Sequence, residues 1–231
     1  RPVGGHHRCG GRDGDDVALP APLALAAQKK SLIAQERDEA SRRAWRAEVA
    51  DLDPRTLVFL DETGTPTTLT PLRARAPRGQ RAIGRVPRGR WATVTLLATL
   101  TPAGMGPAML LDGAVDRAAF EAFVAQQVVP SLAPGQTVIL DNLSVHQSAR
   151  ARNLIAAAGC ELRFLPTYSP DFNPIEQAFA KLKQHLRRAE ARSFAALRAA
   201  VGPALDAITP ADATAFYAAA GFALSAPPGQ P

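Results

Sequence analysis

The order of short apolar runs along the chain is the feature that most constrains its fold. Three runs rich in β-branched and apolar residues come first, at 55–62, 90–101 and 106–113. Two further runs, at 137–141 and 161–166, alternate with helical segments around 116–129 and 146–158. Successive strands followed by strand–helix alternation are typical of a mixed sheet covered by helices. We therefore expect an α/β fold with a mixed central β-sheet flanked by α-helices.

The C-terminal third is expected to be helical. Asn173 suits an N-cap position, and the apolar face that follows predicts a helix over 174–188. A further helix is predicted from residue 193, with an interruption at 202–203 where Gly precedes Pro. The last helix is expected over 210–221.

Composition divides the chain into four segments. Residues 1–22 lack any hydrophobic period and residues 223–231 are rich in Pro, so both are expected to be disordered tails. Residues 23–50 predict a helical linker, and residues 51–222 predict the main domain. The first residue is Arg1 rather than Met, which suggests a fragment of a longer protein.

Cysteine content, hydropathy and charge limit the class of protein. Cys9 and Cys160 are the only cysteines, too few for a disulfide framework. No run approaches the roughly 18 to 20 apolar residues that a membrane span needs. Lys and Arg number 27 against 21 Asp and Glu, and this net charge of +6 favours a polyanionic partner such as nucleic acid. A cytoplasmic protein that is not inserted in a membrane is expected.

Three acidic residues occupy positions from which a fold presents side chains to a site. Asp61 and Asp141 each end an expected strand, and Glu176 lies in the first turn of an expected helix. Three carboxylates gathered in this way can hold two divalent cations for in-line displacement at phosphorus. Each acid also has a structural explanation, because the aspartates can cap turns and Glu176 can satisfy helix N–H groups.

Four stretches of the sequence carry a resemblance to a known family. They are LVFLDET, APRGQ, VILDNLSVH and LRFLPTYSPDFNPIEQAFAKLK. They resemble the signature stretches of bacterial transposases of the insertion sequence 630 family, which are relatives of mariner elements, over about 56–222. The 34 residues between Asp141 and Glu176 match the spacing of that family's acidic triad. The resemblance implies a ribonuclease-H-like catalytic domain whose triad is Asp61, Asp141 and Glu176.

The resemblance also implies a cofactor, a partner and a reaction. Mg²⁺ or Mn²⁺, two ions per site, would be bound by the triad. Double-stranded DNA would be cleaved at element ends and joined to target DNA at TA dinucleotides, by a homodimer or by association with a full-length transposase. The place of action would be the bacterial cytoplasm, at the nucleoid. Family members carry helix-turn-helix modules ahead of the catalytic domain, which residues 1–50 are too short to supply, so we expect the targeting module to be missing.

Four polar residues accompany the triad in this resemblance: Glu62, Asn142, His146 and Asn173. Asn142 is expected to orient Asp141 or to touch a phosphate. For His146, a catalytic role and a structural hydrogen bond at the start of a helix remain alternatives.

Two basic segments predict contacts with DNA. The first holds seven arginines and no acid: Arg73, Arg75, Arg78, Arg81, Arg85, Arg88 and Arg90. Pro and Gly interrupt it, so a loop or hairpin whose guanidinium groups bind phosphates is expected. The second follows Glu176 along its helix: Lys181, Lys183, Arg187 and Arg188. A solvated basic surface is the alternative for the first segment and for Lys183.

Three functions fit these observations. The expected one is a metal-dependent DNA strand-transfer domain. The first alternative is a truncated, inactive remnant that acts at most as a DNA-binding or inhibitory subunit, in which the arginines matter and the triad does not. The second is a ribonuclease-H-like nuclease that hydrolyses strands without joining them. Strand joining, and its dependence on the triad, separates the three.

Overall fold

The structure is a computed structural model that describes residues 34–71, 73–84, 93–144 and 146–224. The described residues belong to one compact unit. The expected tail at 1–22 lies outside them, as do residues 23–33 of the expected linker and residues 225–231.

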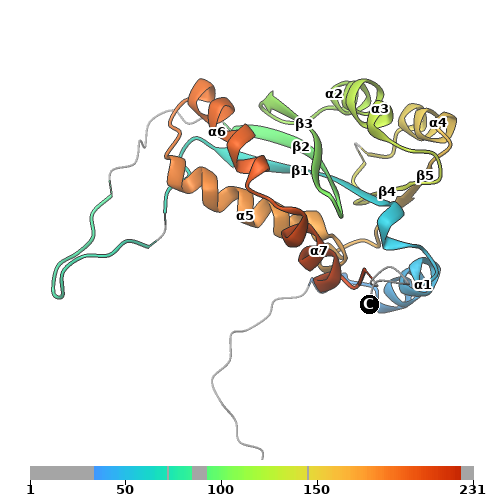
Figure 1. Ribbon diagram of the computed structural model, residues 1–231, viewed down its shortest axis with the longest axis horizontal. Coiled ribbons are helices and arrows are strands. Elements are labelled where there is room, and N and C mark those ends of the chain that lie inside the picture. Colours follow the sequence, from blue (N-terminus) through green and yellow to red (C-terminus); the bar gives the residue numbers. More distant parts are fainter. Residues whose placement is uncertain (1–33, 72, 85–92, 145, 225–231) are drawn as a thin grey trace, which may run out of the picture. The chain divides into compact units, whose positions relative to one another are not determined.

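Strands and helices follow one another along the chain largely in the predicted order (Figure 1). The strands are β1 Leu57–Pro66, β2 Thr93–Thr101, β3 Gly104–Asp112, β4 Thr137–Leu140 and β5 Glu161–Phe164. The α-helices are α1 Glu39–Val49, α2 Arg117–Phe123, α3 Val129–Ser131, α4 Ala149–Ala157, α5 Pro174–Ala189, α6 Phe194–Asp206 and α7 Pro210–Ala219. Between them lie two 3-10 turns, η1 Pro54–Thr56 and η3 Pro170–Phe172, and one π-helical turn, η2 Val124–Val128.

The strands form one mixed sheet in the order β3-β2-β1-β4-β5. The first three pair antiparallel, and β4 and β5 are added in parallel. Figure 1 shows α5, α6 and α7 on one side of the sheet and α2, α3 and α4 on the other. The prediction of a mixed central sheet flanked by helices is therefore confirmed.

Side chains of β1 alternate between two cores. Leu57 and Phe59 pack in the core that includes α5, α6 and α7, whereas Val58 and Leu60 pack in the core that includes α2 and α4. Because alternate residues of a strand point to opposite faces, Asp61 points to the side of the sheet that α5 covers.

The first strand differs from its prediction. β1 begins at Leu57 and continues beyond Glu62 to Pro66, because antiparallel pairing with β2 extends from Phe59 to Pro66. Asp61 therefore lies inside a strand, and the expectation that it ends one was wrong. Pairing with β4, however, stops at Phe59. Asp61 consequently lies two residues beyond the last residue of β1 that pairs with β4.

The predicted interruption at Gly202 and Pro203 was also wrong. α6 continues through both residues to Asp206. An internal proline removes an N–H donor and leaves one carbonyl oxygen without its helical partner. Both residues are exposed, so water can hydrate that oxygen, while Leu197 and Val201 hold the opposite face of α6 in the core.

The other C-terminal helices begin close to where they were predicted. α5 begins at Pro174 after Asn173, and α7 begins at Pro210 after Thr209, which forms a capping box with Asp212. None of the helices in the described ranges combines the length and apolar character that crossing a membrane requires.

Candidate active site

Pairing of β1 with β4 brings two of the predicted carboxylates together. These parallel strands are in register up to Phe59 and Ile139. Asp61 and Asp141 each follow two residues later, so both belong to the series of side chains that faces α5. The Asp61 residue is only 6% exposed, whereas the side chain of Asp141 is 33% exposed.

The third predicted carboxylate reaches this place from α5. Glu176 is the third residue of that helix, which packs against β1 and β2. Ile175 and Phe179 on the buried side of α5 share a core with Phe59 of β1. Glu176 itself is exposed, and the negative charge of Asp141 acts on it as it acts on Asp61. The fold thus gathers the predicted triad from two strands and the start of one helix.

Asn173 occupies the N-cap position of α5 but uses its side chain elsewhere. It forms no side-chain capping hydrogen bond. Instead its Nδ2 donates to Asp61 Oδ2 at 2.7 Å, and the backbone N–H of Glu62 donates to Asp61 Oδ1, also at 2.7 Å. Both oxygens of Asp61 are therefore held. Asn173 Oδ1 is buried and has no hydrogen-bond partner within the described residues.

His146 lies between two acids. Its Nδ1 is 2.5 Å from Asp141 Oδ1, and its Nε2 is 2.7 Å from Glu62 Oε2. The ring is fully buried and packs on Phe120 of α2, with the ring centroids 4.8 Å apart. His146 precedes α4, whose N-cap is Ser148, so the helix-start role weighed for this residue belongs to Ser148. Geometry instead makes His146 a link between β1 and the end of β4.

Burial and like charges shift the ionisation of these groups. Burial raises the pKa of Asp61 to about 8, and the charge of Asp141 adds to the shift. Partial burial also raises the pKa of Glu176, whereas the positive charge of Lys183 lowers it. Burial alone would lower the pKa of His146, but its contacts with Asp141 and Glu62 outweigh burial and raise it to about 9. The site therefore holds more negative charge than its own residues neutralise.

The triad fits a divalent metal by its chemistry. Carboxylate oxygens are the ligands that Mg²⁺ and Mn²⁺ prefer, and Asp141 Oδ2 and the Glu176 carboxylate have no hydrogen bond in the described part of the chain. Among the described residues, no three His, Cys, Asp or Glu side chains are already arranged to hold a metal. Side-chain rotation would therefore be needed before the three carboxylates could share an ion.

Three of the remaining predicted residues differ in their contacts. Asn142 is exposed and accepts a hydrogen bond from Gln147 at 2.7 Å rather than one that reaches Asp141. Lys183 is close enough to Glu176 to act on its ionisation. Lys181 instead forms a 2.6 Å ion pair with Asp212 of α7.

The arginine-rich segment is only partly described. Arg73, Arg75, Arg78 and Arg81 are exposed on a stretch without helix or strand, which Figure 1 shows as the teal segment projecting from the body. The expectation of a loop is met for residues 73–84. Arg85, Arg88 and Arg90 lie outside the described residues. Arg187 and Arg188 lie in the last turn of α5.

Sequence reasoning missed an arginine that supports the turn before α5. Arg42 of α1 is 1% exposed and makes two hydrogen bonds to the carboxylate of Asp171, at 2.9 and 2.6 Å. Its Cζ also lies 3.9 Å from the centre of the Phe172 ring, directly before Asn173. Within the sequence Arg42 is one of several basic residues of an amphipathic helix, so nothing marked it out.

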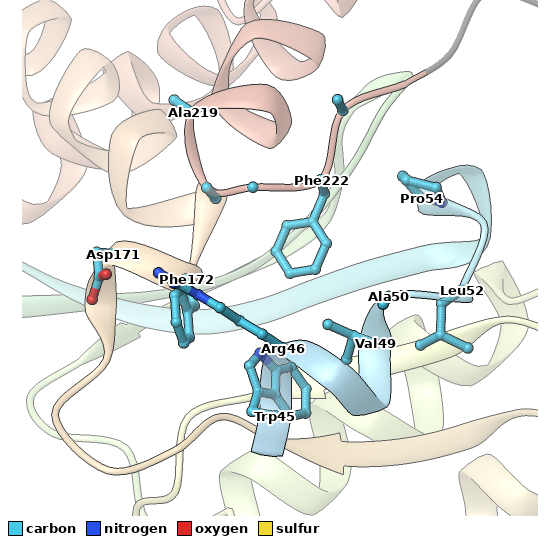
Figure 2. Close-up of a pocket in the computed structure, with 13 residues that line it drawn as sticks. Trp45, Arg46, Val49, Ala50, Leu52, Pro54, Asp171, Phe172, Ala219 and Phe222 are labelled. Carbon is cyan, nitrogen blue, oxygen red and sulfur yellow. The ribbon is translucent and has the colours of Figure 1, made fainter. Parts of the chain in front are cut away.

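A cavity of about 690 Å³ lies beside the ion pair of Arg42 and Asp171, and no residue of the triad lines it (Figure 2). Trp45 and Val49 of α1, Phe172 of η3 and Phe222 after α7 line it. Arg46 and Asp171 also line it, but Asp171 is already paired with Arg42, so the cavity adds no unpaired acid near the carboxylates of the triad. The candidate active site is therefore the open end of the sheet at Asp61 and not this cavity.

Comparison with known proteins agrees with the fold. A family profile described as DDE superfamily endonuclease matches residues 56–198, more than half of the chain. No match was found among curated proteins. A mariner Mos1 paired end complex with Mg superposes with a TM-score of 0.67 at 17% identity, over 87% of this chain and 66% of that chain. A pre-cleavage Mos1 transpososome gives a TM-score of 0.65 at 14% identity, over 86% of this chain and 64% of that chain.

A structure of the Mos1 catalytic domain with Raltegravir and Mg also matches, with a TM-score of 0.54 at 14% identity, over 80% of this chain and 87% of that chain. At such identities these matches show the fold alone, and they agree with the predicted ribonuclease-H-like fold. The chain spans about 64% of the Mos1 chain in the transpososome. Assignment to the insertion sequence 630 family remains a prediction. Since the profile covers both strands of the site and α5, this chain belongs to the DDE superfamily endonuclease family.

Proposed function

We propose that this chain is the catalytic domain of a transposase that cleaves DNA strands and joins their ends to a target. The observation that carries the proposal is the meeting of Asp61, Asp141 and Glu176 at one end of the sheet, in a chain that matches the endonuclease family. Mos1 structures that share its fold are described as transposon-end and strand-transfer complexes. These descriptions support a DNA substrate for this chain.

We propose Asp61, Asp141 and Glu176 as the ligands of Mg²⁺ or Mn²⁺, two ions per site. Mos1 structures with Mg and with Mn share the fold, which supports divalent metal use. Bound there, the ions would activate the attacking oxygen and stabilise the leaving oxygen of the phosphodiester. Their positive charge would also offset the burial and the charge of Asp141, which together raise the pKa of Asp61.

The surrounding residues hold two of the three carboxylates in place, and the third, that of Glu176, has no hydrogen bond in the described residues and can rotate toward a metal. Asn173 and the N–H of Glu62 fix both oxygens of Asp61. His146 and the N–H of Leu143 engage Asp141 Oδ1, which leaves Oδ2 for a ligand. Side chains held by such hydrogen bonds lose little freedom when the reactants bind, which favours correct positioning.

Several finer parts of the proposal come from the family resemblance. They are joining at TA dinucleotides, action as a homodimer or with a full-length transposase, and a place at the bacterial nucleoid. The net charge of +6 agrees with a DNA partner.

Strand cleavage and joining on a labelled duplex with candidate element ends tests the proposal. We would compare the chain with Asp141→Ala and with Asp206→Ala, a matched control because Asp206 is exposed on α6. Joined product from the chain and from Asp206→Ala, but not from Asp141→Ala, is the expected result. Hydrolysed strands without joining would support a nuclease instead. Duplex binding without product from any variant would support the inactive remnant.

A further inference from the structure

One face of α5 connects the catalytic carboxylate with two basic residues. Lys183 and Arg187 follow Glu176 by seven and eleven residues, which are close to two and three whole helical turns. The three side chains therefore lie in one row, with Ala180 between the first two. Lys183 is close enough to Glu176 for its positive charge to lower the pKa of that carboxyl group.

This row ends at a basic cavity. The cavity has a volume of about 420 Å³, and its lining consists of Pro71, Arg73, Gln184, Arg187 and Arg188. Three of these residues carry a positive charge and none carries a negative one. Figure 1 places the end of α5 beside the point where the projecting teal segment leaves the body, which explains how Arg73 meets the last turn of the helix.

The three arginines of the cavity differ from those that stabilise the fold. Arg42 pairs with Asp171, and Arg163 pairs with Glu48 and Glu161. Arg192, which lies near the cavity, donates to the carbonyl oxygen of Leu69 at 2.5 Å.

By contrast, within the described ranges no hydrogen bond or ion pair is found for Arg73, Arg187 or Arg188. Like charges that converge without partners repel one another, and a phosphate would offset that repulsion through charge-assisted hydrogen bonds.

The separation along α5 sets the position of such a phosphate. Eleven residues at a rise of about 1.5 Å place Arg187 about 16 Å from Glu176. Because one strand of duplex DNA turns about a tenth of a circle around the axis for each rise of about 3.4 Å, a straight line of this length spans about three nucleotides of the strand. We propose that a DNA strand follows this face of α5, an inference that rests on the proposed function. The cavity of Arg73, Arg187 and Arg188 then holds a backbone phosphate about three nucleotides from the bond that the triad cleaves.

Equilibrium binding to a duplex of arbitrary sequence, without divalent metal and at several salt concentrations, tests the cavity independently of catalysis. Arg187→Ala and Arg73→Ala are compared with Arg198→Ala, an exposed arginine of α6 that does not line the cavity. One lost phosphate contact removes about 0.9 from the slope of log affinity against log salt, or about eightfold in affinity at about 0.1 M salt. We expect this loss for both cavity variants and none for Arg198→Ala.

The double variant Arg73→Ala, Arg187→Ala tests whether the two arginines share one phosphate. Its loss should be smaller than the two single losses combined, because both arginines serve one phosphate contact. Losses that multiply, or an equal loss for Arg198→Ala, would overturn the proposal. Thermal unfolding of each variant shows whether it is folded.

The position is tested once the cleaved bond is mapped. A single uncharged methylphosphonate about three nucleotides from that bond should weaken binding to the chain about eightfold, and should weaken binding to Arg187→Ala no further. Equal sensitivity of the two proteins would overturn the placement. If the cavity variants reduce the salt slope as expected but the chain never joins strands, the phosphate-binding cavity stands and the proposed function is refuted. Normal strand joining together with salt slopes that the cavity variants leave unchanged would refute the phosphate-binding cavity and leave the proposed function standing.

Discussion

The two ends of α5 differ in how their polar groups are satisfied. At the N-terminal end, Asp61 accepts hydrogen bonds at both oxygens, and His146 contacts an acid with each ring nitrogen. At the C-terminal end, the arginines of the basic cavity are without partners in the described part of the chain. A site that positions reacting atoms benefits from side chains held before the substrate arrives. A site that binds a phosphate backbone needs charge that is still free to pair.

The largest effect on stability is expected from His146→Phe. The substitution keeps the packing on Phe120 but leaves Glu62 and Asp141 without their shared partner. Breaking a buried pair costs roughly 3 to 5 kcal/mol, and because both acids are partly exposed we expect about 2 kcal/mol in urea unfolding.

His185→Phe on α5 is the matched control, since His185 has no ion pair in the described residues and should change stability little. Equal losses from the two variants would show that His146 contributes through packing alone.

A smaller loss is expected from Arg42→Met. Methionine keeps the apolar contacts of α1, but Asp171 loses both hydrogen bonds and the Phe172 ring loses the nearer of its two cations, while Arg46 remains. Asp171 is half exposed, so we expect about 1.5 kcal/mol. Arg43→Met, at an exposed position on the same helix, should cost almost nothing. If the turn positions Asn173, Arg42→Met should also reduce strand cleavage at temperatures where it is fully folded.

Asp61→Asn should change stability in the opposite direction. The folded pKa of Asp61, about 8, lies above its unfolded value, so the folded chain binds more protons and its stability falls as pH rises from about 4 to about 8. Asparagine removes this dependence. After the loss of one hydrogen bond we expect a net gain of about 1 kcal/mol at pH 8 without metal, and no gain at pH 4. Added Mg²⁺ should then stabilise the original chain more than the variant.

The order of the elements and the positions of the three carboxylates could be predicted from the sequence, because hydrophobic periodicity and turn residues are local signals. Sequence reasoning misplaced Asp61 at the end of a strand because the extension of β1 depends on pairing with β2, more than twenty residues away in the sequence. The contact of Asn173 with Asp61 was hidden in the same way. An asparagine before Pro174 fits a helix cap equally well, and only the packing of α5 on β1 directs its amide to Asp61.

The smallest expected effect separates two lysines that the sequence treats alike. Lys181 is paired with Asp212, whereas Lys183 lies in the row that leads from Glu176 to the basic cavity. Lys181→Met should lower Tm by roughly a degree or two, as expected for an exposed ion pair, and should leave the salt dependence of DNA binding unchanged. Lys183→Met should leave Tm unchanged and reduce the salt slope by about 0.9. Equal slopes for the two variants would mean that DNA contacts α5 on more than one face, and the division of the helix into a catalytic and a phosphate-binding end would then fail.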